Sequence, residues 1–427
     1  MKGKLMIKKK NRALAIFMAV LLVAFTSSNG SLAALGGPRD SVITLQSPLL
    51  DASNTWDAKG NQQMADSWVA KGWFGTGLVY QVSFAPVGSI INLTYNIKGK
   101  DGKPLAFTKV NLRINKGYSE SGAIVEVDGV KTNGQDRPPF DQANVIHVTD
   151  AFGNVTFALK NLDLESSAEP EPENYTSKPI FSEDKLDRLH AQMLPEVNGE
   201  KGDHSVITEF HYYKPKTPIN ITANKPTIKL VTPALNDSNS ILDSGRSLRQ
   251  VYAPWGSDVV VVYKVTGDDG RALPNQVLTL KADSGKTTMQ ATSDAFGYAA
   301  FTVKSAQGAP MASPKSPISA VPSMSAAFST LIPQIAGVTP ALVEGVEIHY
   351  HRSVSTSVEK SGKTSTLSIS VTGAVGKSVG VDVTGLKSSK IKINSAVQVI
   401  SLKVTTGTKT VSVTIDGKKY TSKVVVK

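Results

Sequence analysis

A tetrapeptide with one acidic side chain, Asp-Ala-Phe-Gly, occurs twice in the sequence, beginning at Asp150 and at Asp294. A duplicated catalytic site would repeat an aspartate in this way, because a carboxylate acts as a general acid or base beside a suitable polar group. Asp followed three residues later by Gly is also typical of a type I turn, which the aspartate caps. No repeated His, Ser or Glu accompanies the two segments, so the sequence favours the turn. We expect Phe157 and Phe301 to be buried just beyond the two turns.

Two histidines, His349 and His351, alternate along a predicted strand and therefore share one face. Zinc is bound by such side chains, but a site needs at least a third protein ligand. A related stretch earlier in the chain holds His211 and Tyr213 at the equivalent places, so the histidine pair is not repeated. A structural or surface role is therefore favoured over zinc binding.

Oxygen-bearing side chains gather at residues 51–61 (DASNTWDAKGN), as in many calcium-binding loops. The segment lacks the D-x-D-x-D-G spacing of an EF-hand loop, and the related stretch at 236–243 offers only NDSNSILD. No G-x-S-x-G, P-loop or dinucleotide-binding motif is present, and the absence of Cys excludes thiol nucleophiles and disulfides. We expect no catalytic residues, cofactor or metal ion, and we expect the protein not to be an enzyme. An enzyme site within the long insertions described below is a further hypothesis.

The repeated tetrapeptide is one part of a longer internal repeat. Matching blocks follow one another in the same order, so the chain contains two copies of one module, at about 41–216 and 226–352. The matched blocks are 43–54 with 228–239, 85–105 with 253–273, 149–160 with 293–304, and 209–213 with 347–351.

The repeated blocks have the period of β-strands. In the first copy apolar and polar residues alternate over 90–98, which predicts a strand with one buried face. In the second copy Val260 and Val262 make the outer face apolar as well, so we expect that face to be covered by another part of the chain. Asp101-Gly102 and Asp269-Gly270 fit tight turns after these strands.

These motifs together resemble the bacterial immunoglobulin-like (Big-1) domain of the invasin and intimin group, over about 85–216 and 253–352. The resemblance implies β-sandwiches used in tandem as a rigid stalk or adhesive tip. The chain departs from that group because no outer-membrane barrel precedes the modules and because two gaps are too long. The residues that carry the resemblance are Asp101, Gly102, Pro104, Val110, Asp150, Gly153 and Phe157, and Asp269, Gly270, Leu278, Asp294, Gly297 and Phe301.

The two long gaps are predicted insertions at 161–207 and 305–344. The first begins with an acidic, Pro-rich stretch and continues into residues 182–194, whose Leu186, Leu189 and Met193 spacing predicts a short helix. The second is rich in Ala, Ser and Pro over 308–332. Each insertion is either a tethered surface loop or a binding site for a protein or glycan partner.

Charge is concentrated at the two ends of the chain. Residues 353–427, which alternate as short strands, hold 12 Lys, no Arg and three acidic residues, and so carry +9 of the net +12. Six basic residues lie among the first 34, which leaves the modules between at about −3. Such a distribution does not indicate a nucleic-acid-binding protein. The lysines either bind an anionic cell-wall or envelope polymer or discourage aggregation between sheet edges.

Residues 1–34 have the pattern of a secretory signal peptide. A basic segment (1–12) precedes an apolar core (13–25) and a Ser-Leu-Ala cleavage site at 31–33. An uncleaved membrane anchor is the alternative, although thirteen apolar residues are few for a bilayer span. No later apolar run is long enough, so we expect no transmembrane span after signal removal.

The sequence predicts an all-β protein made of tandem Ig-like β-sandwiches with long insertions and a small C-terminal β domain. The predicted units are a signal peptide (1–34), a first module with an N-terminal extension (35–216), a second module (226–352) and a Lys-rich domain (353–427). We expect a secreted or cell-surface structural or adhesive protein of the bacterial envelope. The alternative is an extracellular polysaccharide- or cell-wall-polymer-binding protein, with Trp68, Trp73 or Trp255 on an exposed platform.

Overall fold

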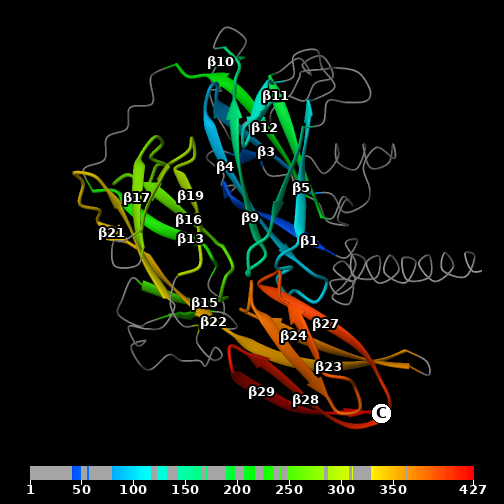
Figure 1. Cartoon of the computed structure of the whole chain (residues 1–427). Coiled ribbons are helices and arrows are strands. Elements are labelled where there is room, and N and C mark those ends of the chain that lie inside the picture. The colour runs from blue at the N-terminus through cyan, green and yellow to red at the C-terminus, as the bar shows by residue number, and fades with distance from the viewer. Residues whose placement is uncertain are drawn as a thin grey trace, which may run out of the picture.

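The computed structural model shows three β-sandwich units, and all the elements in the described part of the chain are strands (Figure 1). The all-β fold class predicted from the sequence is therefore confirmed. The structure describes residues 41–49, 55–56, 79–116, 123–131, 143–164, 169–170, 189–197, 206–216, 225–234, 240–242, 248–282, 287–306, 310, 328–361 and 364–427.

The first module consists of two sheets that enclose a core of alternating apolar side chains, among them Leu93, Tyr95, Leu112 and Phe157. Neighbouring strands are antiparallel except that β12 is parallel to β3 and to β10. One sheet has the order β1 (Val42–Ser47), β4 (Ile90–Lys98), β9 (Asn154–Asn161), β6 (Val125–Val127) and β7 (Val130–Lys131). The other has the order β2 (Thr55–Trp56), β3 (Val79–Pro86), β12 (Val206–Lys214), β11 (His190–Val197), β5 (Lys109–Lys116) and β8 (Ala143–Val148), with β10 (Glu169–Pro170) beside β12.

The second module repeats this arrangement, as the sequence repeat predicts. Its core holds the equivalent side chains, including Val261, Tyr263, Leu280 and Phe301. One sheet has the order β19 (Tyr298–Val303), β16 (Val259–Thr266), β13 (Thr227–Thr232) and β21 (Leu342–Val343). The other has the order β14 (Ser240–Leu242), β15 (Leu248–Pro254), β22 (Gly345–His351), β20 (Phe328–Ile335), β17 (Val277–Ala282) and β18 (Thr287–Thr292).

The segments predicted as insertions each supply a strand to the sandwich. In the first module, β11 lies between β12 and β5 and is buried along its whole length. The predicted helix over 182–194 is therefore wrong for 190–194, because that segment pairs with a strand on each side; its residues 182–188 lie outside the described part of the chain. In the second module β20 takes the same place, between β22 and β17.

The C-terminal domain is a separate small sandwich around Leu367, Ile369, Val381 and Val413. The strands predicted there are confirmed except for 391–400, which is divided between Ser389–Lys392 and Val397–Val404, and the Asp416-Gly417 turn joins the last two strands. One sheet has the order β23 (Ser353–Ser361), β24 (Thr364–Thr372) and β27 (Val397–Val404). The other has the order β26 (Ser389–Lys392), β25 (Ser378–Val383), β28 (Gly407–Ile415) and β29 (Lys418–Val426).

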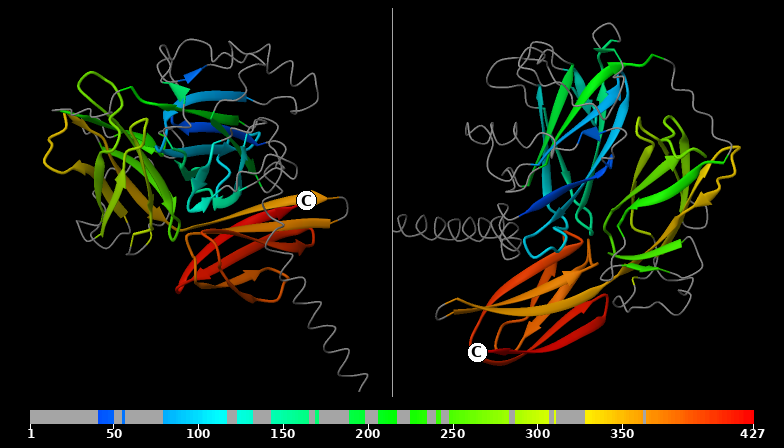
Figure 2. Two further views of the ribbon diagram at one scale, coloured as in Figure 1. Left: turned by 90° about the horizontal axis from the view of Figure 1, so that it is seen from above. Right: turned by 180° about the vertical axis from the view of Figure 1, so that it is seen from behind.

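The C-terminal domain follows the second module without a linker. Only Arg352 separates β22 of the second module from β23 of the C-terminal domain. The two modules lie side by side, and the C-terminal domain lies across one end of both (Figure 2). The contact surfaces between the units are therefore the main places where groups from distant parts of the sequence meet.

Candidate functional site

The two Asp-Ala-Phe-Gly segments form equivalent turns, as predicted. The N–H groups of Phe152 and Asn154 donate to Asp150 Oδ1 over 2.8 and 2.9 Å. In the second module the N–H groups of Phe296 and Tyr298 donate to Asp294 Oδ1 over 2.9 and 2.8 Å. Phe157 and Phe301 are buried in the strands that follow, so this prediction is confirmed in full.

The second oxygen of each aspartate reaches the other module. Val260 N–H donates to Asp150 Oδ2 over 2.9 Å, and Asn92 N–H donates to Asp294 Oδ2 over 2.7 Å. Asn92 and Val260 occupy the same place in the sequence repeat, one in β4 and the other in β16. Each turn therefore caps a strand of the opposite module, and the two contacts are related by an approximate two-fold symmetry. We call this contact the reciprocal interface.

Apolar side chains fill the reciprocal interface around the two carboxylates. Phe296 of the second module lies 6.0 Å from Phe210 of the first, measured between ring centroids. Val260 and Val262 pack into the core of the first module, which confirms that the apolar outer face of this strand is covered. Phe152 packs in the opposite direction, into the core of the second module. Each core thus receives side chains from the other module.

Both carboxylates are almost fully withdrawn from water, with Asp150 and Asp294 exposed by only 4% and 3%. Burial raises the pKa of Asp150 to about 6 and the pKa of Asp294 to about 7, against the hydrogen bonds that lower both. None of the hydrogen bonds described above joins either carboxylate to a His, Ser or Glu side chain, and each carboxylate oxygen accepts at least one backbone N–H. The two carboxylates therefore join the two modules through hydrogen bonds.

A second repeated polar arrangement is a buried Glu–His pair in each module. Glu209 Oε1 and His211 Nε2 are 2.6 Å apart in β12, and the equivalent atoms of Glu347 and His349 are 2.5 Å apart in β22. In the second module burial opposes ionisation of Glu347, but the hydrogen bond and charge of His349 outweigh it, so the pKa of Glu347 is lowered.

Flanking residues hold these Glu–His pairs in equivalent ways. Gln192 Nε2 donates to Glu209 Oε2 over 2.7 Å, and Thr330 Oγ1, at the equivalent position of β20, donates to Glu347 Oε2 over 3.2 Å. An aromatic ring lies near each histidine on two sides. His211 has Phe84 and His190 at 5.6 and 5.3 Å, and His349 has Tyr252 and Phe328, both at 5.8 Å. The sequence comparison aligned these residues without indicating that they form a buried pair.

The histidine pair considered for zinc is divided between two roles. His349 belongs to the Glu–His pair, while burial lowers the pKa of His351 to about 4 and keeps its ring neutral. Within the described ranges no three His, Cys, Asp or Glu side chains converge as metal ligands. The calcium-like segments at 51–61 and 236–243 lie largely outside the described residues.

A clamp of a different kind joins the second module to the C-terminal domain. The Arg352 side chain is buried, donates from Nε to Gly373 O over 2.8 Å and contacts Asp416 Oδ2 at 3.1 Å. Its guanidinium lies 5.6 Å from the centre of the Trp255 ring. Trp255 is thus half-buried in this junction and is not part of an exposed platform, while Trp68 and Trp73 lie outside the described residues.

The Gly373 position shows how closely the two units approach. A Cβ atom placed on this residue would lie 2.2 Å from His351 O and 3.0 Å from Trp255 N, and its φ is +69°. Glycine is therefore required here both by the backbone conformation and by the contact.

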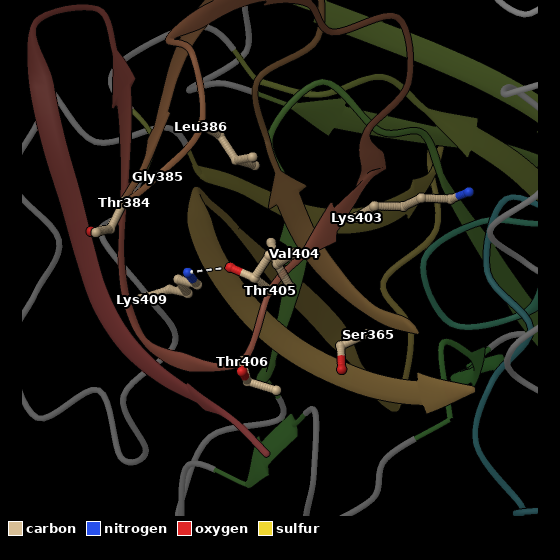
Figure 3. Close-up of a pocket in the computed structure, with 9 residues that line it drawn as sticks. All are labelled: Ser365, Thr384, Gly385, Leu386, Lys403, Val404, Thr405, Thr406 and Lys409. Carbon is tan, nitrogen blue, oxygen red and sulfur yellow. Dashed lines mark hydrogen bonds between the residues drawn. The ribbon is translucent and has the colours of Figure 1, made fainter. Parts of the chain in front are cut away.

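A depression of about 290 Å³ lies in the C-terminal domain, beside the ends of β25 and β27 (Figure 3). Its lining combines hydroxyl groups with two lysines. Lys409 Nζ donates to Thr405 Oγ1 over 3.0 Å, whereas the Lys403 side chain points away from Lys409. The two ammonium groups therefore do not converge on one ligand position.

A larger groove, of about 630 Å³, lies where all three units meet. We call it the junction groove. It is lined by the end of β8 and the Asp150 turn of the first module, the start of β16 in the second, and two loops of the C-terminal domain. The lining residues are Phe107, Ile146–Asp150, Val155, Thr156, Gly256–Asp258, Val260, Thr302, Val375 and Asn394–Ala396.

No helix in the described part of the chain is long and apolar enough to cross a membrane. The predicted signal peptide lies outside the described residues.

The chain is similar to solved structures that include bacterial surface proteins. Latent PorU from Porphyromonas gingivalis matches with 13% identity over 91% of this chain and 34% of its own, at a TM-score of 0.22. Invasin, a bacterial integrin-binding protein, matches with 15% identity over 80% of this chain and 58% of its own, at 0.18. FdeC, an adhesin of Escherichia coli, matches with 12% identity over 80% of this chain and 94% of its own, at 0.20.

The chain thus spans about a third of the PorU structure and somewhat over half of the invasin structure. TM-scores this low carry no conclusion about shared activity, so the Ig-like architecture rests on the strand pairing described above. No protein-family model and no curated protein matches the chain. The specific resemblance to the invasin and intimin group stays a prediction.

Proposed function

We propose that this protein is a non-enzymatic structural or adhesive component of the bacterial envelope, exported by its N-terminal signal and built from Ig-like modules. The observation that carries the proposal is the reciprocal interface. Asp150 and Asp294 each accept a backbone hydrogen bond from the other module, and the two bonds are related by the approximate two-fold symmetry.

Such an interface suits a protein that must hold its shape. Rotation of one module against the other would break both aspartate contacts and expose Phe152 and Phe296, which are buried in the opposite cores. Buried polar groups that lose their partners cost free energy, as does apolar surface returned to water. The Arg352 clamp extends the same rigidity to the C-terminal domain. A stalk or surface layer needs rigidity of this kind between its units.

Export is supported by the N-terminal sequence and by the amino-acid composition. A basic segment, a short apolar core and a small-residue cleavage site occupy the first 34 positions. The chain has no Cys, so its stability outside the cell does not depend on disulfide formation. Tandem rigid modules and an export signal together favour the envelope over the cytoplasm.

The proposal is tested by fractionating the producing bacterium and treating intact cells with an external protease. We expect the protein in the envelope fraction and accessible to the protease. A matched control carries Leu21→Arg and Leu22→Arg, which interrupt the apolar core of the signal, and should stay in the cytoplasm. Wild-type protein found only in the medium or only in the cytoplasm would overturn the proposal.

The charge of the C-terminal domain favours a second candidate function, binding of an anionic wall polymer. Of the net +12, +9 lies in residues 353–427. The test is co-sedimentation with insoluble cell-wall material before and after its anionic polymers are removed. Replacing Lys387, Lys390 and Lys392 by Gln should weaken binding to untreated walls, whereas Lys229→Gln and Lys281→Gln in the second module should not. Equal binding of untreated walls by the C-terminal variants and the second-module variants would exclude this function.

A further inference from the structure

Among the strands that the structure describes, β8 forms an edge of the first module. It pairs with β5 on one side only, and it is the last strand in its sheet. Ile146 and Val148 expose 60% and 53% of their surface on this strand. The equivalent strand of the second module, β18, is also an edge, but it has Gln290 and Thr292 at the same two positions. The apolar edge is therefore a property of the first module alone.

The backbone of β8 also presents hydrogen-bonding groups outward. Thr149 N–H donates to Thr108 O over 2.9 Å, and Thr149 O accepts from Phe107 N over 3.1 Å, so Thr149 is bonded toward β5. Because bonded and non-bonded residues alternate in an antiparallel ladder, the N–H and C=O groups of Val148 and Ile146 point away from β5. Unpaired backbone groups beside apolar side chains form a template for strand addition.

The charged groups around this edge are few and mostly paired or buried. Residues 146–149 form one wall of the junction groove, which is continuous with the reciprocal interface through Asp150 and Val260. The titratable groups that line the groove are His147, Asp150 and Asp258, with no Lys or Arg among the lining residues. At the rim Asp258 pairs with the exposed Lys304, and His147 lies 3.5 Å from Asp128. A strand that carries exposed apolar residues would extend this edge through apolar contacts with Ile146 and Val148.

The chain itself contains such a strand in its C-terminal domain. Among the described strands, β29 is an edge strand whose backbone pairs with β28 alone, while its Ser422 side chain contacts Thr356 of β23. Lys419, Lys423 and Val425 alternate on one face of β29, and Val425 is 63% exposed. The C-terminal domain that contains β29 carries +9, whereas the modules carry about −3. The C-terminal domain and the modules are thus opposite in net charge.

We infer that the protein associates head to tail with itself, with β29 of one copy adding as a further strand to the free edge of β8 in the next copy. The two surfaces differ, so the contact is heterologous and leaves one free β8 and one free β29 on each dimer. Further copies can add at both ends, and the rigid arrangement of the three units would give the resulting chain a regular repeat. The inference rests on the proposed structural role and names the partner as a second copy of this chain.

The test is sedimentation analysis of the exported full chain over a range of concentrations at low and high salt. At low salt we expect the average mass at least to double as concentration rises, and high salt should weaken association because the contact is partly electrostatic. Ile146→Lys with Val148→Lys should keep the protein monomeric, and so should Val425→Lys. The matched control, Gln290→Lys with Thr292→Lys on the second module, should associate like the wild type.

A mixing experiment separates this arrangement from others. The β8 variant retains an intact β29, and the β29 variant retains an intact β8, so their mixture should form dimers and nothing larger. A wild type that stays monomeric at all concentrations would overturn the inference. So would a Val425→Lys variant that still associates, which would indicate pairing of β8 with β8. The protease experiment on whole cells reports on location independently, so failure of one idea does not imply failure of the other.

Discussion

In the first module the turn aspartate has Asn154 beside it, whereas in the second module the equivalent neighbour of Asp294 is Tyr298. The carbonyl at the centre of each turn is also held differently. Asn96 Nδ2 donates to Phe152 O over 2.9 Å, while Lys264 Nζ donates to Phe296 O. The backbone partners of the two carboxylates are nevertheless the same in both modules. An interface built on backbone N–H groups thus tolerates changes in the side chains around it.

The same comparison has a different result at the sheet edges. There the two modules share the strand pairing but not the side chains, with Ile146 and Val148 on β8 and Gln290 and Thr292 on β18. Polar residues on an edge strand prevent unwanted pairing, and apolar ones invite it. The copies therefore agree where they bind each other and differ where they face outward, which is where a separate role for each copy would arise.

The largest expected effect comes from removing one turn aspartate. Asp294→Ala leaves the N–H groups of Phe296, Tyr298 and Asn92 without their acceptor in a buried place. We expect a loss of about 4 kcal/mol in the free energy of unfolding, since each unsatisfied buried donor costs about 1–3 kcal/mol. Asp150→Ala should cost a similar amount if the two contacts are equivalent. Chemical denaturation measures both.

Hydrogen exchange identifies the atoms concerned. Asp150→Ala should speed exchange of the Val260 amide in the second module, and Asp294→Ala that of the Asn92 amide in the first. Asp101→Ala, in an exposed turn where the carboxylate caps only Lys103 N–H, is the control and should cost about 0.5 kcal/mol or less. If each substitution affected only its own module, the interface would not be reciprocal.

A smaller effect is expected from Gly297→Ala in the same turn. The added Cβ would lie 2.5 Å from Val265 O, and φ at this position is +79°. We expect a loss of about 3 kcal/mol, because the clash is with backbone and the conformation is strained. Gly270 has the same φ but no atom within 4 Å of an added Cβ, so Gly270→Ala should cost only about 1 kcal/mol. Gly153→Ala should match Gly297→Ala, and a clear difference in their unfolding midpoints would show that the turns are not equivalent.

Local features of the fold follow well from the sequence. The repeated Asp-x-x-Gly spacing and the alternation after it are sufficient to predict the caps at Asp150 and Asp294 and the buried Phe157 and Phe301. The apolar outer face at Val260 and Val262 also indicates that something covers this strand. What covers it does not follow, because the partner surface comes from the other module and includes Asp150, 110 residues away from Val260.

The strands within the predicted insertions were missed for a related reason. The segment at 190–197 contains Pro195, and its apolar residues also fit a helical period, so its place between two other strands is not visible locally. A signal was nevertheless present. Pro195 precedes Glu209 by 14 residues, and Pro333 precedes Glu347 by the same number, which extends the repeat through β11 and β20. The Glu–His pairs escaped prediction because only the three-dimensional structure shows that Gln192 and Thr330 complete them.

The smallest expected effect distinguishes the two carboxylates by their titration. Burial raises both pKa values above the ordinary value of about 4, so the folded protein binds protons more tightly than the unfolded chain. The stabilisation from each group is therefore complete below about pH 4 and is lost as pH rises from there to the folded pKa. That loss should be complete near pH 6 for Asp150 and near pH 7 for Asp294. The difference of about one pH unit corresponds to about 1.4 kcal/mol.

Unfolding free energies measured against pH in the two Asp→Asn variants separate these contributions. Asp294→Asn retains the titration of Asp150, and Asp150→Asn retains that of Asp294. The side chain of Asn154 lowers the pKa of Asp150 by a hydrogen bond that Tyr298 does not supply to Asp294. Asn154→Ala in the Asp294→Asn background should therefore raise the pKa of Asp150, so that the loss of stability extends to a higher pH, closer to that seen for Asp294. The assignment of the two pKa values would be contradicted if the two Asp→Asn variants lost stability over the same pH range. It would also be contradicted if the stability of both variants increased between pH 5 and 7.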